Sequence, residues 1–133
     1  MIETNFDEVK VMYVRSDSGV RGGEKAFNML ESKLPDLKGR RFYGLIFGIP
    51  PDDEYRACAA LEEEDDPLAM GLKVGIIPAG KYVQEKIIDW SKNLKKIGEV
   101  FRSLSQKYDV DHTRPNIEFY RSMKELLVKV PIN

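Results

Sequence analysis

The sequence carries the same order of apolar segments twice, once on each side of an acidic run at its midpoint. The first half has a β-branched segment at residues 9–14, an amphipathic segment at 22–37 and apolar segments at 42–47 and 55–61. The second half repeats this order at residues 82–88, 89–108, 117–121 and 126–132, and Glu and Asp fill positions 62–66 between the halves. This pattern predicts one domain formed by duplication, with repeats of about residues 1–66 and 67–133.

The spacing of the apolar residues predicts the type of each element. Phe27, Leu30 and Leu34 recur at intervals of three and four residues, as on one face of a helix, and Ile97 and Leu104 lie on a similar face in the second half. The shorter apolar segments are rich in β-branched and aromatic residues and predict strands, with one further strand at 72–78. Each half is therefore expected to run strand, helix, strand, strand. The predicted fold class is α+β, a duplicated β-α-β-β repeat with pseudo-twofold symmetry, an antiparallel sheet, two helices over one face and a central ligand cleft.

Charge and cysteine content exclude several classes of function. The formal net charge is −1, so the chain has no overall positive field for a polyanion, and we expect no direct binding to nucleic acid. Neither a secretory signal nor a membrane span is evident, which makes the cytoplasm the expected location. Cys58 is the only cysteine and His112 the only histidine, so we expect no disulfide, no metal site and no cofactor.

Glu118 is an isolated acid in an otherwise apolar strand segment. Alternation along a strand places Glu118 and Tyr120 on one face and Ile117 and Phe119 on the other. If the helices cover the Glu118 face, the carboxylate needs a partner, because burial of an unpaired charge is strongly unfavourable. A cationic ligand would be such a partner. A solvated face, or neutralisation by Arg114 or Arg121, would explain the same residue without any function.

Aromatic residues near the predicted cleft suit a flat organic cation, through stacking and cation–π contacts. Core packing alone would explain any single one of them. Together with Glu118, the predicted ligand-binding residues are Tyr43, Phe47, Tyr55, Tyr82, Trp90 and Tyr120.

Five segments resemble the GyrI-like small-molecule-binding family, which includes the effector-binding domains of AraC- and MerR-type regulators. They are residues 43–50, 54–58, 77–82, 114–120 and 127–132, and the resemblance covers nearly the whole chain. It implies two strand-helix-strand-strand repeats around a cleft for hydrophobic, often cationic, compounds. Residues 114–120 match the family's Arg-Pro-x-x-Glu-x-Tyr pattern, whose glutamate is the usual ligand-contacting acid, and this implies the same role for Glu118.

The leading hypothesis is a module that binds hydrophobic, cationic small molecules as a sensor, as a sequestering protein or as the ligand-binding partner of a separate regulatory protein. The chain is expected to be a monomer or a homodimer. Some members of the family are hydrolases of reactive cyclopropane-containing compounds. The alternative hypothesis is therefore a detoxifying hydrolase that uses Glu118 and a cleft tyrosine. A third and weaker hypothesis is a protein–protein adaptor.

Overall fold

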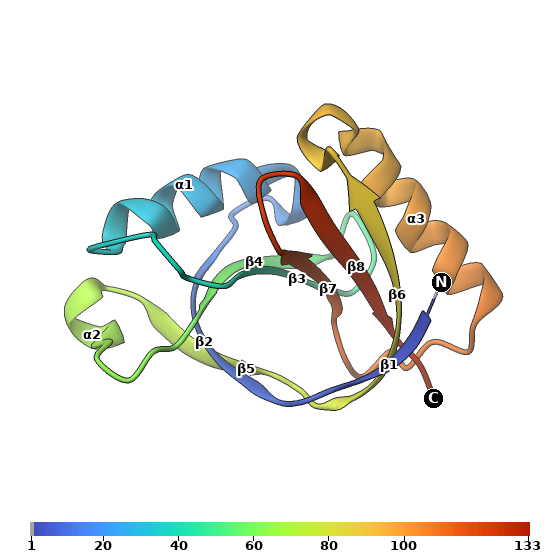
Figure 1. The fold of residues 1–133 in the computed structure, drawn as a ribbon, viewed down its shortest axis with the longest axis horizontal. Helices are drawn as coiled ribbons and strands as arrows, with labels where there is room; N and C mark the ends of the chain where they lie inside the picture. The colour runs from blue at the N-terminus through green and yellow to red at the C-terminus, as the bar shows by residue number, and fades with distance from the viewer. Residues whose placement is uncertain (1) are drawn as a thin grey trace.

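The strands form one curled antiparallel sheet of eight strands, with two longer helices against its outer face (Figure 1). The computed structural model describes residues 2–133. In chain order the elements are β1 (Ile2–Phe6), β2 (Val9–Arg15), η1 (Gly19–Gly22), α1 (Gly23–Lys33), β3 (Phe42–Phe47), β4 (Glu54–Ala60), α2 (Pro67–Met70), β5 (Lys73–Ile77), β6 (Gly80–Ile88), η2 (Trp90–Lys92), α3 (Leu94–Lys107), β7 (Asn116–Tyr120) and β8 (Glu125–Pro131).

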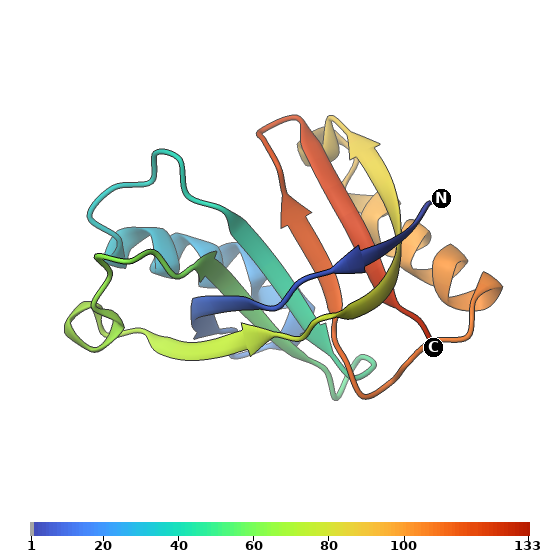
Figure 2. The same ribbon diagram turned by 60° about the horizontal axis from the view of Figure 1, so that its bottom comes forward.

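The strand order in the sheet is β1-β6-β8-β7-β3-β4-β2-β5. The order β3-β4-β2 in the first half of the chain is the same as β7-β8-β6 in the second, and β3 pairs with β7 at the centre. Each outer strand pairs with the other half of the chain: β1 of the first half pairs with β6, and β5 of the second half pairs with β2. Figure 2 shows β1 and β5 running along the side of the sheet away from the helices. The α+β class and the antiparallel sheet are confirmed, and superposition of the two halves stays a prediction.

Three apolar clusters hold the fold together. The outer face of the sheet packs against α1 through Ala26 and Leu30, and against α3 through Val100 and Leu104. The inner face, which the curl of the sheet encloses, carries the third cluster: Val11, Tyr43, Leu45, Cys58, Ala60, Ile77, Tyr82 and Ile117. The sheet is therefore covered on both faces along its centre, and a polar side chain there is cut off from bulk water.

Both longer helices are shorter than the predicted segments, and every predicted strand but one differs from its predicted limits by one or two residues. The first helix ends at Lys33 rather than Leu37, because Leu34 is extended, as is usual for a residue that precedes proline. Strand β1 is an addition to the predicted elements, since it has no apolar alternation and forms by pairing with β6. The strand Phe42–Phe47 has the predicted limits.

The acidic run at residues 62–66 is more than a solvated linker. Asp65 forms a two-pronged ion pair with Arg40, with Nη2 to Oδ1 at 2.7 Å and Nη1 to Oδ2 at 2.9 Å. Both side chains are covered, at 6% exposure for Arg40 and 5% for Asp65. The hydrogen bonds from Arg40 lower the pKa of the Asp65 carboxyl below its usual value. This pair fixes the loop before β3 to the junction between the halves.

We expect Asp65→Asn to lower the free energy of unfolding by about 1.5–3 kcal/mol at pH 7, the range for hydrogen bonds to charged groups. The depressed pKa means that this stabilisation is present above the unfolded-state pKa of Asp and is lost as pH falls through the folded-state pKa. Urea unfolding at pH 7 and pH 3 measures both effects. Glu64→Gln, at an exposed neighbour, is the control and should stay within about 0.5 kcal/mol of the parent. Equal effects of the two variants would show that the Arg40–Asp65 pair contributes nothing.

Candidate functional site

Glu118 is a buried carboxylate in the central strand β7, on the face of the sheet that the helices cover. Only 5% of the residue is exposed. Its Oε1 accepts hydrogen bonds from the Tyr55 hydroxyl at 2.6 Å and the Tyr120 hydroxyl at 2.8 Å. Strand alternation explains the shared face of Glu118 and Tyr120. Tyr55 of β4 lies on the same face. It pairs with Ile46 of β3, and Ile46 is two positions from Gly44, the β3 residue that pairs with Glu118.

Gly44 makes room for this carboxylate. It is the direct cross-strand neighbour of Glu118 on β3. A Cβ at this position would lie closer than 3.0 Å to both Glu118 Oε1 and the Tyr55 hydroxyl. Glycine is unfavourable inside a strand, and one reason to find it there is a close approach by another group. The absence of a side chain at Gly44 therefore lets the Tyr55 hydroxyl and the Glu118 carboxylate meet next to its Cα.

Aromatic rings from the helix side pack against the two tyrosines that donate to the carboxylate. Phe27 of α1 makes edge contacts with Tyr55 and Tyr120, with ring centroids 6.3 and 5.2 Å apart. Trp90 of η2 makes an edge contact with Tyr120 at 5.0 Å, and its Nε1 donates to the Ser122 carbonyl oxygen at 3.2 Å. These rings thus come from two separate elements, α1 and η2. We define the Glu118 site as Glu118, Tyr55, Tyr120, Phe27 and Trp90.

Burial raises the pKa of the Glu118 carboxyl above its usual value, and the two phenol hydrogen bonds partly oppose this shift. The pKa of Tyr55 is raised well above its usual value, first by burial and then by the charge of Glu118. The pKa of Tyr120 is raised for the same two reasons. Both phenols therefore stay protonated at neutral pH and act as hydrogen-bond donors. No Lys, Arg or His of residues 2–133 forms an ion pair with Glu118.

The second carboxylate oxygen of Glu118 is free to accept. Oε1 receives both phenol hydrogen bonds, and Oε2 receives none from the described residues. Every fully buried side-chain oxygen or nitrogen of the described residues has a hydrogen-bond partner. Because Oε2 has none, it is not fully buried. Oε2 is therefore a carboxylate oxygen that keeps some exposure and has no donor among the described residues.

The structure brings four of the seven predicted site residues together: Glu118, Tyr55, Tyr120 and Trp90. Tyr43, Phe47 and Tyr82 lie on the inner face, on the opposite side of the sheet. Tyr43 stacks on Phe119 at 4.8 Å, and the guanidinium of Arg56 lies 4.6 Å from the Phe47 ring centre. Tyr82 donates to the Pro78 carbonyl oxygen at 3.0 Å.

Sequence reasoning misses two residues of this region. Phe27 is predicted only as part of the apolar face of a helix, and nothing local indicates that its ring packs against Tyr55 and Tyr120. Gly44 does carry a signal, since it interrupts the apolar strand Phe42–Phe47. The neighbour across the sheet, however, is set by pairing of distant strands.

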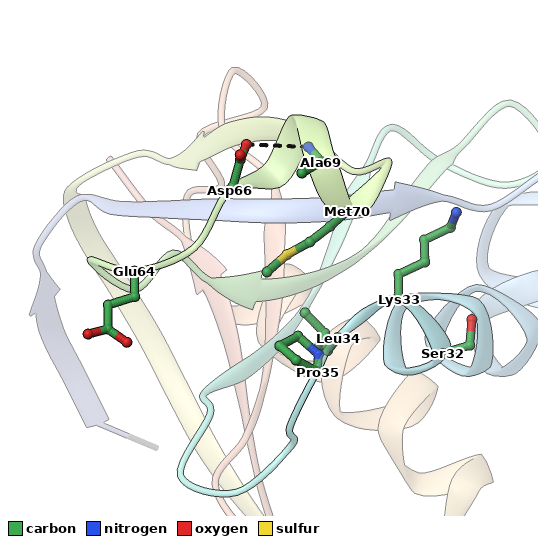
Figure 3. Close-up of a pocket in the computed structure, with 8 residues that line it drawn as sticks. All are labelled: Ser32, Lys33, Leu34, Pro35, Glu64, Asp66, Ala69 and Met70. Atoms are coloured by element: carbon green, nitrogen blue, oxygen red, sulfur yellow. Dashed lines mark hydrogen bonds between the residues drawn. The ribbon is translucent and has the colours of Figure 1, made fainter.

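A separate groove of about 500 Å³ lies between the end of α1 and α2 (Figure 3). Leu34, Pro35 and Met70 form its apolar part, and Lys33, Glu64 and Asp66 bring charges of both signs. Asp66 accepts a hydrogen bond from the Ala69 amide at 3.3 Å, which caps the short α2 helix. This groove lacks the isolated charge that distinguishes the Glu118 site.

The described residues contain no cluster of three or more His, Cys, Asp or Glu side chains arranged to hold a metal ion. Within residues 2–133 no helix is both long and apolar enough to cross a bilayer. The Glu118 site itself consists of a single carboxylate among phenols and aromatic rings.

Comparison with solved structures gives clear matches of fold at low sequence identity. An integron cassette protein from the mobile metagenome of Vibrio cholerae matches with a TM-score of 0.75 and 13% identity, over 99% of this chain and 95% of the other. The protein SAV2435, solved bound to tetraphenylphosphonium, matches with a TM-score of 0.67 and 12% identity, over 99% and 93%. A hydrolase from Listeria innocua matches with a TM-score of 0.60 and 10% identity, over 99% and 90%. No family model and no curated protein sequence matches the chain.

Proposed function

We propose that the chain binds hydrophobic organic cations at the Glu118 site. The observation that carries this proposal is a buried carboxylate with no cationic partner in residues 2–133 and with one oxygen free to accept. An ionised carboxylate in such a place is costly, and a bound cation would compensate that cost. The phenol hydrogen bonds hold the acid in place in the absence of ligand.

The surroundings favour a delocalised cation over a small inorganic one. The walls are aromatic rings, whose electron-rich faces attract a cation and whose area favours apolar groups. A metal ion would need several oxygen or nitrogen ligands, and the site offers one carboxylate. The rings of Phe27 and Trp90 must move aside for a bulky ligand, because Glu118 is only 5% exposed.

We propose that the chain is a GyrI-like domain formed by duplication of one repeat. The GyrI-like resemblance and the similar strand order of the two halves support a duplicated effector-binding fold. The fold is shared with SAV2435, whose ligand in that structure is a lipophilic cation. We propose a role as a sensor or sequestering protein, either alone or as the ligand-binding partner of a regulatory protein.

Calorimetric titration with tetraphenylphosphonium tests the proposal, with neutral triphenylphosphine oxide as the uncharged comparison. We expect saturable binding of the cation and much weaker binding of the neutral compound. The affinity for the cation should fall as pH drops through the raised pKa of Glu118, because the protonated acid no longer offers a negative charge. Equal affinities for the two compounds, or a cation affinity that does not change with pH, would contradict the proposal.

The alternative function is hydrolysis of a reactive small molecule. One structure of the same fold is described as a hydrolase, and the Tyr55 hydroxyl touches the carboxylate that would serve as base. Chromatography of each bound compound after incubation separates the alternatives. Unchanged ligand supports binding alone, and a product that depends on Glu118 supports turnover.

A further inference from the structure

Lys129 is a second buried ionisable residue that the Glu118 site does not use. It lies on β8 and is only 6% exposed. It pairs across the sheet with Gln84 on one side and Ile117 on the other, so its side chain is on the inner face. Glu118, next to Ile117 in the chain, projects to the outer face. The sheet therefore separates the two groups.

The amino group of Lys129 has only a neutral partner among the described residues. Its Nζ donates to the Gln84 side-chain oxygen at 2.5 Å and lies 5.5 Å from the centre of the Phe6 ring. Along β6, Lys86 forms an ion pair with Glu125 at 3.9 Å, so the Glu125 carboxylate is paired with Lys86 rather than with Lys129. No carboxylate of residues 2–133 forms an ion pair with Lys129.

A buried amine without a counter-ion favours the uncharged form. Burial lowers the pKa of Lys129 below its usual value, and no nearby carboxylate opposes the shift. A neutral amine that donates to Gln84 keeps its lone pair free. Desolvated lysines of this kind are good nucleophiles toward carbonyl carbon.

The aromatic ring next to the Lys129 amino group belongs to an outer strand of the sheet. Phe6 belongs to β1, an outer strand that pairs only with β6. Outer strands near a chain end open more easily than central strands, because fewer hydrogen bonds and contacts hold them. The two side chains next to the Lys129 amino group, Gln84 and Phe6, are neutral, which favours a small uncharged reagent.

We propose that Lys129 is a reactive amine site on the inner face that condenses with small uncharged aldehydes. The nitrogen lone pair attacks the carbonyl carbon to form a carbinolamine. Loss of water from this adduct leaves an imine between the Lys129 nitrogen and the former carbonyl carbon. The reaction is reversible and involves no redox change. It uses residues on the opposite face of the sheet from the Glu118 site, so it stands independently of cation binding.

Limited reductive methylation tests this site. The whole chain is treated at pH 7 with substoichiometric formaldehyde and cyanoborohydride, which delivers hydride to the imine carbon and traps it as N-methyl-lysine. Peptide mass spectrometry then gives the labelling ratio of Lys129 to Lys92, an exposed lysine of η2. We expect severalfold more label on Lys129 than on Lys92 at pH 7, because burial lowers the pKa of Lys129 below its usual value.

Two controls keep the result interpretable. In urea-unfolded chain the ratio should approach one, because both lysines then share the same environment. In fully dimethylated folded protein, the ¹³C-methyl signal that disappears in Lys129→Arg reports the titration of Lys129, and its midpoint should lie below that of the same signal in the urea-unfolded chain. Labelling of Lys129 no faster than that of Lys92 at pH 7 in the folded protein, or a Lys129 midpoint equal to that in the unfolded chain, would overturn the proposal.

Discussion

Replacing Glu118 by Gln is expected to weaken tetraphenylphosphonium binding by about 2–5 kcal/mol, the range for removing one member of a buried charge pair. Gln keeps the shape of the side chain, and its oxygen can still accept from Tyr55 and Tyr120. The change therefore removes the charge with little disturbance of packing. Calorimetry of parent and variant with the cation and with triphenylphosphine oxide measures the effect. The neutral compound should lose far less affinity, since it never used the charge.

Without ligand, the Glu118→Gln variant should be at least as stable as the parent at neutral pH. Burial raises the folded-state pKa of Glu118 above the unfolded value, so the ionised form is disfavoured in the folded state. The contribution of this acid to stability is fully present below the unfolded-state pKa and is lost as pH rises through the folded-state pKa. Gln does not ionise, so the variant does not lose stability in this way as pH rises. Equal affinity losses for the charged and neutral compounds would show that Glu118 shapes the site without acting through its charge.

Replacing Gly44 by Ala is expected to lower cation affinity at least about tenfold, or roughly 1.4 kcal/mol. The new Cβ would fall closer than 3.0 Å to both Glu118 Oε1 and the Tyr55 hydroxyl, so the carboxylate and the phenol must separate or shift. Overpacking of this kind also costs about 1–3 kcal/mol of stability. Both quantities can be measured by calorimetry and urea unfolding of the same preparations.

The chain offers a matched control and a rescue for this change. A Cβ added at Gly98 of α3 would meet nothing within 4 Å, so Gly98→Ala should leave binding unchanged and raise stability by about 0.5–1 kcal/mol. Tyr55→Phe removes one of the two atoms that crowd Gly44. Gly44→Ala should therefore cost less in the Tyr55→Phe background than alone, as a double-mutant cycle would show. Additive effects of the two changes, or parent-like binding by Gly44→Ala, would contradict the role of Gly44.

Local patterns in the sequence were enough to predict most elements and the exceptional position of Glu118. Alternation along 117–121 predicts that Glu118 and Tyr120 share a face, and their hydrogen bond requires it. The apolar spacing of Phe27, Leu30 and Leu34 predicts a helix, and the repeated order of segments predicts an antiparallel α+β fold. These features depend on interactions within a few residues or on the periodicity of one element. Neighbouring positions in the sequence are therefore enough to predict them.

The tertiary structure alone decided which distant residues meet. Tyr55 and Gly44 reach Glu118 from β4 and β3 only because β7 pairs with β3 at one particular register. The same pairing places Tyr43 on the inner face and so separates it from the Glu118 site, although Tyr43 and Tyr55 are the same type of residue in similar apolar segments. The exchange of β1 and β5, the Arg40–Asp65 pair and the isolation of Lys129 are likewise results of strand order. Because a shift of register by one residue would turn every side chain of a strand to the other face, the site depends on the cooperative packing of the whole sheet and not on any single segment.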